Sequence, residues 1–296
     1  MTGRTGDPDQ RHPGEPAQRA RLAQLATGMA LLLVPLALAL VGPWIAGDAG
    51  PRGVSFTLGD GHWLGTDHSG RDVVHQVLWG GRSVVLTALA ATALAYLLAL
   101  PIGLAAALTR RGWLEEALVR PLDVLLAIPS LLLVLMAGTL LDPGTVGLAL
   151  IVAAVNVPDA VRMVRAGAAE VAARPAVEAL RMLGEGWWRL AFGHVGRAML
   201  RMLAADAGVR LTGVLYLVAT AAFLGVGVGP DAADWAVMVD QNRTGLMVQP
   251  WAVVVPALLI VALTTGTNLV CDAVLARRPP AGKEAADDVR HRGARR

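Results

Sequence analysis

Lysine is almost absent from this sequence: among 26 lysine and arginine residues, Lys283 is the only lysine. A phosphate-binding loop of the G-x-x-x-x-G-K-[ST] type is therefore excluded, so the chain does not bind ATP in that way itself. Cysteine is equally scarce, because Cys271 stands alone. A single cysteine excludes an intrachain disulfide and makes a poor metal site.

Patterns typical of catalysis are also missing. The sequence has no Ser/His/Asp arrangement, no H-E-x-x-H motif and no paired-carboxylate site, so an enzyme has little support. Histidines and aspartates do gather in one stretch, at His62, His68, His75, Asp60, Asp67 and Asp72. Their spacings match no metal-ligand pattern, and we interpret them as side chains of a solvated loop.

Apolar residues dominate what is present: they make up 55% of the 296 residues, and the mean hydropathy is +0.53. Several apolar runs reach the roughly 20 residues that a helix needs to cross a bilayer. These runs have no polar face that could contact water, which argues against a water-soluble protein with the runs buried in its core. The composition predicts an all-α, polytopic membrane protein.

We expect six membrane spans, over residues 22–46, 84–108, 121–141, 146–164, 203–226 and 251–274. Residues 47–81 are predicted to form an external insert. The terminal segments 1–21 and 276–296 lack periodicity and are predicted to be disordered tails. A cleaved signal peptide is the alternative for the first span, but the apolar run and the tail before it are too long for one.

Positive charge is distributed unevenly along this predicted topology. The two tails, the 109–120 turn and the 162–201 region hold 21 of the 26 Lys and Arg residues. Because cytoplasmic loops carry the excess of Lys and Arg, the tails and the 162–201 region are predicted to be cytoplasmic.

The longest polar interruption of the hydrophobic body is the 174–197 segment, RPAVEALRMLGEGWWRLAFGHVGR. Polar side chains recur at helical spacing, at Arg174, Glu178, Arg181 and Glu185. The opposite face is apolar, with Ala176, Val177, Leu180 and Leu183. Pro175 suits a first helical position, Gly184 should end or bend the helix, and Trp187, Leu190 and Ala191 begin a second apolar face. The segment is either a handle for a cytoplasmic partner or a loop lying on lipid headgroups.

The external insert carries a turn, GTDHSGRD, at residues 65–72. Ser69 as N-cap with Asp72 three residues later predicts a capping box that opens a helix. This structural explanation is sufficient. A rigid turn at the outer opening of a membrane path could, however, also be a docking site for a soluble protein that delivers a substrate.

Four charged residues lie in or near predicted spans, namely Asp123, Asp159, Asp206 and Arg210. Charges inside a membrane are costly and often functional. Here the aspartates lie near predicted cytoplasmic ends, and Arg210 is one helical turn from Asp206, so we favour structural pairing. A secondary transporter or channel driven by an ion gradient, using Asp159, Asp206 or Arg210, is the alternative function.

Three stretches carry a resemblance to a known family. Residues 62–67 (HWLGTD), 70–72 (GRD) and 78–83 (LWGGRS) are similar to W-x-G-T-D-x-x-G-R-D followed by Y-G-x-R-x-S. Residues 123–130 (DVLLAIPS) are similar to D-x-x-L-A-x-P-S. The third stretch has FLGVG at 223–227, followed by Pro230, Trp235, Met238, Pro250-Trp251 and Asn268-Leu269. In this order they resemble the inner-membrane permease subunits of ABC importers, specifically the C-type permease of the dipeptide, oligopeptide and nickel group.

The resemblance implies a type I ABC importer permease fold, with its core at 82–275 and a cytoplasmic coupling loop at 170–200. The family's E-A-A-x-x-x-G motif forms a coupling helix in a groove of the ATPase subunit. The implied ATPase contacts are Glu178, Ala179, Leu180, Gly184 and Arg189. The implied external gate or docking residues are Gly65, Thr66, Asp67, Gly70, Arg71 and Asp72.

The implied partners are a homologous permease, two cytoplasmic ATP-binding subunits, an external substrate-binding protein and membrane lipid. The resemblance implies no cofactor, no metal and no nucleic acid, and a non-catalytic subunit in the bacterial inner membrane. Peptides are the default cargo, with nickel or another small solute as alternatives.

The second half of the motif, I-x-L-P, is not kept: His194, Gly196 and Arg197 stand at its three named positions. Without that proline, the following helix is expected to run on rather than kink.

Overall fold

The computed structural model describes residues 15–59, 61–109 and 111–275, and this part of the chain is helical apart from loops and two isolated β-bridges. Its long helices are α1 (Glu15–Ile45), α2 (Val73–Leu108), α3 (Gly112–Leu126), α4 (Ser130–Leu141), α5 (Gly144–Ala172), α7 (Arg197–Phe223) and α9 (Trp251–Leu275). Shorter elements are α6 (Pro175–Met182), η1 (Arg189–Gly196), α8 (Trp235–Asn242) and η2 (Arg243–Gly245). The predicted all-α class is confirmed.

Five helical segments are long and apolar enough to cross a membrane: α1, α2, α5, the continuous segment 189–223 and α9. The pair α3–α4 makes a sixth span if it is counted as one. The prediction of a polytopic protein is therefore confirmed, and the third span is the one that differs in form.

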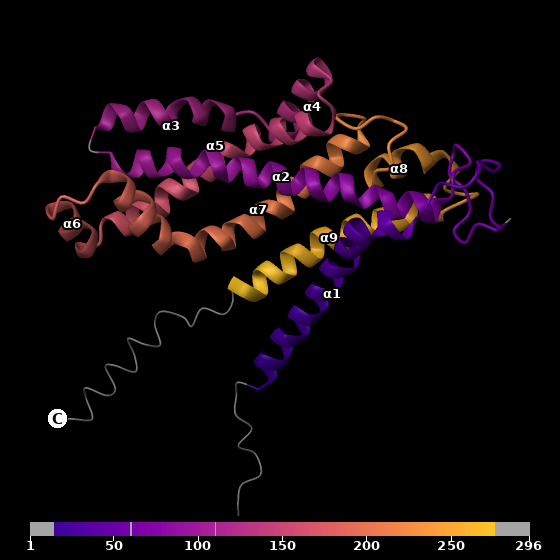
Figure 1. The fold of residues 1–296 in the computed structure, drawn as a ribbon, viewed down its shortest axis with the longest axis horizontal. Helices are drawn as coiled ribbons and strands as arrows, with labels where there is room; N and C mark the ends of the chain where they lie inside the picture. Colours follow the sequence, from indigo (N-terminus) through magenta and orange to yellow (C-terminus); the bar gives the residue numbers. More distant parts are fainter. Residues whose placement is uncertain (1–14, 60, 110, 276–296) are drawn as a thin grey trace, which may run out of the picture.

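The third span is broken rather than straight. Helices α3 and α4 meet at an angle of 86°, and Figure 1 shows α4 turned away from the line of α3. The break falls at Ala127–Pro129, because proline disfavours helical backbone at the residue before it and supplies no N–H donor. Irregular backbone at membrane depth is tolerated only where protein or a water-filled cavity surrounds it.

Several predicted boundaries move. Helix α1 begins at Glu15, inside the segment 1–21 that the sequence predicts as a tail; residues 1–14 and 276–296 lie outside the described residues. Helix α2 begins at Val73 rather than at residue 84. Helix α5 runs through Pro158 to Ala172, beyond the predicted end at 164.

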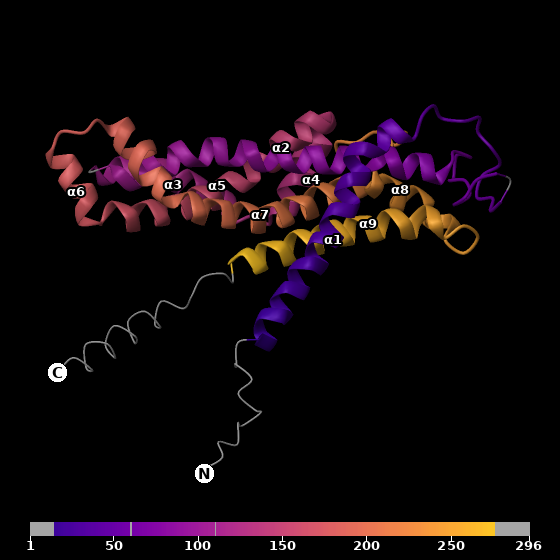
Figure 2. The same cartoon turned by 60° about the horizontal axis from the view of Figure 1, so that its bottom comes forward.

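Two hydrophobic cores follow one another along the bundle. One core joins α2, α5, α7 and α9 around Trp235, and the second joins α2, α5 and α7 with Val177 of α6 and three residues of η1. Figures 1 and 2 place α6 at one end of the bundle and the α1–α2 connection with α8 at the other. The 174–197 segment and the 65–72 turn therefore lie at opposite ends.

Candidate functional site

Helix α6 is short and closed at both ends by the residues that its sequence predicts. Pro175 occupies the first helical turn, where a missing N–H costs nothing. Gly184 has φ +79°, and its N–H donates to the Arg181 carbonyl at 3.1 Å. The Glu185 N–H donates to the Leu180 carbonyl at 3.2 Å. This Schellman arrangement needs a left-handed residue at Gly184, and the predicted helix end is confirmed.

The two predicted faces of α6 are only partly confirmed. Val177 is buried and Leu180 packs against the second core, while Glu178 is exposed. Ala176 and Leu183, however, are exposed rather than packed. Leu183 is the C-cap residue after the last turn of α6. The helical period therefore does not determine where its side chain points. With Met182, 81% exposed, and Leu183, 80% exposed, α6 ends in an apolar tip.

The helix after α6 continues through Arg197 without an interruption, as the loss of the proline predicts. Residues 189–223 form one continuous helical segment of 35 residues. Its first part, η1, has wide π-type turns that the sequence analysis missed. Leu190 and Ala191 of η1 are buried, together with Val195, and all three join the second core.

An aromatic cluster lies beside η1. Trp188 stacks on Phe192 with ring centroids 5.7 Å apart, and Trp187 meets Trp188 edge to face at 4.8 Å. Glu185 pairs with Arg189 at 3.6 Å across one helical turn. The polar and apolar groups exposed here are thus held on one small, ordered surface, which consists of α6, the 183–188 connection and η1.

The 65–72 turn is organised by one carboxylate. Asp67 Oδ1 accepts hydrogen bonds from the Ser69 N–H at 2.8 Å, the Ser69 hydroxyl at 2.9 Å and the Arg71 N–H at 2.8 Å. The capping box predicted with Ser69 is wrong, because α2 begins later and its N-cap is Asp72, which accepts from the Val74 N–H at 3.0 Å. Ser69 instead belongs to the turn around Asp67.

The turn is also fastened to the connection between α7 and α9. Arg71 donates from Nη1 to the Asp231 carbonyl at 2.9 Å and from Nη2 to Asp231 Oδ1 at 3.0 Å. The His68 N–H donates to Asn242 Oδ1 at 2.8 Å. Thr66 and Asp67 are buried, so these two side chains shape the turn and do not themselves face solvent. Trp63, 96% exposed, is the large side chain that does.

Gly70→Ala is expected to destabilise this turn. Gly70 has φ +76°, and a Cβ atom there would lie 2.1 Å from the Gly53 carbonyl oxygen. The left-handed backbone alone costs a residue with a Cβ about 1–2 kcal/mol, and the backbone clash adds to this. Gly47→Ala is the matched control, because Gly47 has φ +60° but open space around it. Thermal unfolding in detergent should show a larger loss for Gly70→Ala; equal losses would contradict the close approach.

No group of three or more His, Cys, Asp or Glu side chains is placed to hold a metal ion within the described residues. Among the histidines of the insert, His62 lies 3.9 Å from the Asp72 carboxylate. The side chains of Asp60 and Arg110 lie outside the described residues.

Asp234 forms the N-cap of α8. Its Oδ1 accepts from the Ala236 N–H at 2.9 Å and from the Val237 N–H at 3.3 Å. The side chain is 1% exposed, and this burial raises the pKa of the Asp234 carboxyl above its usual value.

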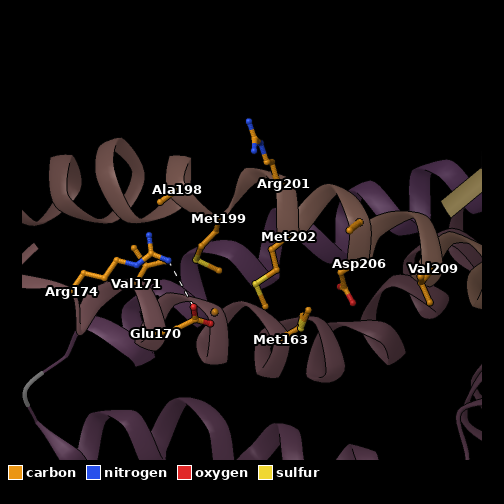
Figure 3. A pocket seen from close by; sticks show the side chains of 12 residues that line it. Met163, Glu170, Val171, Arg174, Ala198, Met199, Arg201, Met202, Asp206 and Val209 are labelled. Carbon is orange, nitrogen blue, oxygen red and sulfur yellow. Dashed lines mark ion pairs between the residues drawn. The ribbon is translucent and has the colours of Figure 1, made fainter. Parts of the chain in front are cut away.

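Three of the four charged residues singled out in or near the spans are paired, namely Asp123, Asp206 and Arg210. Asp206 Oδ2 accepts from Arg210 Nη2 at 3.1 Å, as predicted, and also from the Tyr96 hydroxyl of α2, which the sequence analysis missed. Asp123 of α3 pairs with Arg162 of α5 at 2.7 Å. Asp159 is exposed on α5. Asp206 also lines a cavity of about 590 Å³ between α5 and α7 (Figure 3).

A family model described as the binding-protein-dependent transport system inner membrane component matches residues 99–278, which is more than half of the chain. The chain belongs to this family. The match covers α3 to α9 and includes both α6 and the α5–α7 cavity.

Individual relatives extend the likeness toward the N-terminus of this permease. It is 30% identical over 271 residues to the di/tripeptide transport system permease protein of Pseudomonas aeruginosa, covering 88% of each chain. It is 28% identical over 253 residues to the probable D,D-dipeptide transport system permease protein of Escherichia coli K12, covering 84% of each. The dipeptide transport system permease protein of Haemophilus influenzae is 29% identical over 211 residues, 71% of each chain.

The structure brings the expected ATPase-contact residues of the permease together at one end. Glu178, Ala179 and Gly184 are exposed, Leu180 is half-buried, and Arg189 is exposed on η1. Sequence analysis missed the exposed Met182–Leu183 tip and the Trp188–Phe192 stack beside them. The sequence did hold a signal for this exposed surface. Large apolar side chains occur in the short connection after α6, and a short loop at the end of a bundle can bury few of them.

Proposed function

We propose that the chain is one permease subunit of an ATP-driven importer of short peptides. It is a non-catalytic subunit, set in the bacterial inner membrane with both termini in the cytoplasm. A homologous permease completes the translocation path, two ATP-binding subunits dock at the α6 end, and a substrate-binding protein delivers cargo at the opposite end. Peptides are the proposed cargo because the similar permeases described above are named for dipeptide and tripeptide transport.

The observation that carries this proposal is the way α6 is built into the bundle. Its outer surface, with Glu178 and the Met182–Leu183 tip, is exposed. Its inner side, through Val177 and Leu180, packs into the core shared by α2, α5 and α7. A helix that is exposed on one side and fused to the spans on the other can receive force from a partner and pass it to the path.

The continuous helix beyond α6 gives this motion a route. Because no break in the helix occurs at Arg197, η1 is joined directly to α7 within the continuous segment 189–223. A partner that pushes on α6 and η1 therefore displaces α7 relative to α5. Alternating access then follows from rocking of the two permeases, and ATP hydrolysis stays with the separate subunits.

The 65–72 turn takes the role of the outer gate or docking support in this proposal. Arg71 and the N–H of His68 tie the turn to the α7–α9 connection, so both connections move together. Trp63 beside them offers an exposed contact for the substrate-binding protein.

The test is co-purification with the ATP-binding subunits. Glu178→Arg reverses an exposed charge on α6 and is expected to reduce recovery of the ATPase by about tenfold, the effect of losing roughly 1.4 kcal/mol of binding free energy. The membrane fold should be unchanged, because Glu178 is exposed and lies outside both cores.

Glu116→Arg is the matched control. Glu116 is exposed on α3, as Glu178 is on α6, and it pairs with Arg120 one turn away at 3.2 Å. Its reversal should leave ATPase recovery unchanged. The permease without substitutions must first be shown to recover the ATPase under the same conditions. Undiminished recovery with Glu178→Arg would then count against α6 as the docking helix.

A further inference from the structure

The α5–α7 cavity has a built carboxylate at one end. It opens between α5 and the first half of α7, close to α6, with a volume of about 590 Å³. This is within the roughly 300–1,000 Å³ range of small-molecule sites. Asp206 lies on its wall, and Figure 3 shows its carboxyl group directed from α7 toward α5.

Two neighbours fix this carboxylate in place. The Tyr96 hydroxyl of α2 donates to Asp206 Oδ2, and Arg210 donates to the same oxygen from Nε at 3.3 Å and Nη2 at 3.1 Å. Arg210 also lies over the Tyr96 ring, 5.9 Å from its centroid. All three donors use Oδ2, so within the described part of the chain Oδ1 has no protein hydrogen-bond partner. An acceptor held by neighbours and left with a free oxygen is prepared for a donor from outside.

The remaining walls differ in character along the cavity. Its middle is apolar and adaptable, because three methionines line it: Met163, Met199 and Met202. Its other end carries Arg174, whose Nη2 lies 3.8 Å from Glu170 Oε1 (Figure 3). That pair is long and exposed, so Arg174 keeps donors available. The cavity thus has the Asp206 carboxylate, backed by Arg210, at one end, a methionine-lined middle, and the Arg174–Glu170 pair toward α6.

We propose that this cavity is a station for a short peptide with free termini, on the side of the path nearest α6. The peptide's ammonium group donates to Asp206 Oδ1, its side chains lie against the methionines, and its carboxylate faces Arg174. This assignment rests on the proposed function and adds a binding place for its cargo, with the groups that hold each end of the peptide. Both ends of such a peptide are charged, and the cavity offers a free carboxylate oxygen of Asp206 at one end and guanidinium donors of Arg174 at the other.

Cysteine protection in the complete importer tests the assignment. With Cys271→Ala no native cysteine remains in this chain, and Ala205→Cys then places one thiol on the cavity wall, whose labelling is read on this subunit after separation by electrophoresis. The complex is reconstituted in vesicles of phosphatidylcholine and phosphatidylglycerol, and a maleimide is added from the ATPase side. Trialanine should slow labelling at residue 205 by about fivefold or more, which corresponds to roughly 1 kcal/mol of binding free energy. N-acetyl-trialanine, which lacks the ammonium group, should not.

The control thiol is Ala166→Cys, which lies on α5 outside this cavity beside Arg162 and Arg165. Its labelling should not respond to trialanine. Asp206→Asn should remove the protection at residue 205. Because that change also leaves Arg210 without its anionic partner, Met202→Trp is a second variant: it fills the cavity, keeps Asp206, and should remove the protection as well.

Several results would overturn the assignment. Equal protection by trialanine and N-acetyl-trialanine would show that Asp206 does not bind the ammonium group. Protection produced by phosphatidylethanolamine in the vesicles, and not by trialanine, would make a lipid headgroup the occupant. Failure to label residue 205 without peptide, while residue 166 is labelled, would mean that a neighbouring subunit fills the cavity.

The same preparation separates this assignment from the proposed function. ATP-driven uptake of trialanine with no protection at residue 205 would reject the cavity assignment alone. Protection at residue 205 without ATP-driven uptake would reject the proposed function and leave peptide binding in the cavity standing.

Discussion

Gly184→Pro is expected to reduce ATP-driven uptake by the assembled importer about tenfold or more, because it removes the conformation that closes α6 and aims η1. Gly184 has φ +79°, whereas proline is fixed near −65°. Proline also removes the N–H that donates to the Arg181 carbonyl at 3.1 Å. The chain must then leave α6 in another direction, and the exposed surface built from α6, the 183–188 connection and η1 is lost. Uptake into vesicles, normalised to the amount of permease, is the measurement.

Gly184→Asn is the control, because asparagine tolerates the left-handed region far better than other residues that carry a Cβ. Nothing lies within 4 Å of a Cβ atom at this position, so the asparagine side chain meets no clash. Uptake should stay close to normal with asparagine. If both variants lost uptake equally, the side chain and not the backbone angle would be responsible; if proline left uptake intact, α6 would not need its closed form to act.

The end of α6 was predictable because local chemistry decides it. Pro175 and Gly184 each have a backbone preference that few positions satisfy, so their places in the sequence specify where the helix starts and stops. The spans were predictable for a similar reason, since a long apolar run has no other stable place than a membrane. In both cases the information lies within one stretch of chain.

The features that were missed depend on contacts between distant stretches. Tyr96 meets Asp206 across 110 positions in the chain, and neither residue carries a periodic signal that points to the other. Ser69 was placed at a helix start because a serine followed by an acidic residue fits a capping box. The competing carboxylate of Asp67, two residues away, holds the Ser69 N–H and hydroxyl instead.

The broken third span shows a different limit. Hydropathy remains high through Ala127–Pro129, so apolar composition predicts one uninterrupted span. Pro129 was visible in the sequence, but Pro158 lies inside α5 without breaking it. A proline therefore accompanies a broken helix in one place and a continuous helix in the other, and the packing around it decides which occurs. Pro158 is buried in its helix, whereas Ala127–Pro129 is exposed in this chain.

Trp235→Ala is expected to cost about 3–5 kcal/mol of folding free energy, the largest single loss of stability anticipated for this chain. Trp235 is fully buried where α8 meets α2. Its indole N–H donates to the Val77 carbonyl at 2.8 Å. Gly80 and Gly81 of α2 give the ring its space, because a Cβ atom at Gly81 would lie 2.3 Å from the ring. Alanine would leave a cavity there and remove the hydrogen bond that links α8 to α2, and thermal unfolding in detergent should report the loss.

Trp63→Ala is the matched control, since Trp63 is 96% exposed at the same end of the molecule and its removal should leave the unfolding temperature unchanged. Trp235→Phe separates the two contributions, because phenylalanine keeps most of the ring packing but has no N–H. We expect it to lose about 0.5–1.5 kcal/mol, the net worth of the hydrogen bond from the indole to the Val77 carbonyl, which keeps its helical partner within α2. A Trp235→Ala protein that unfolds at the same temperature as Trp63→Ala would mean that α8 is not anchored on α2. The outer connections would then move independently of the spans, although Arg71 and the His68 N–H would still tie the 65–72 turn to the α7–α9 connection.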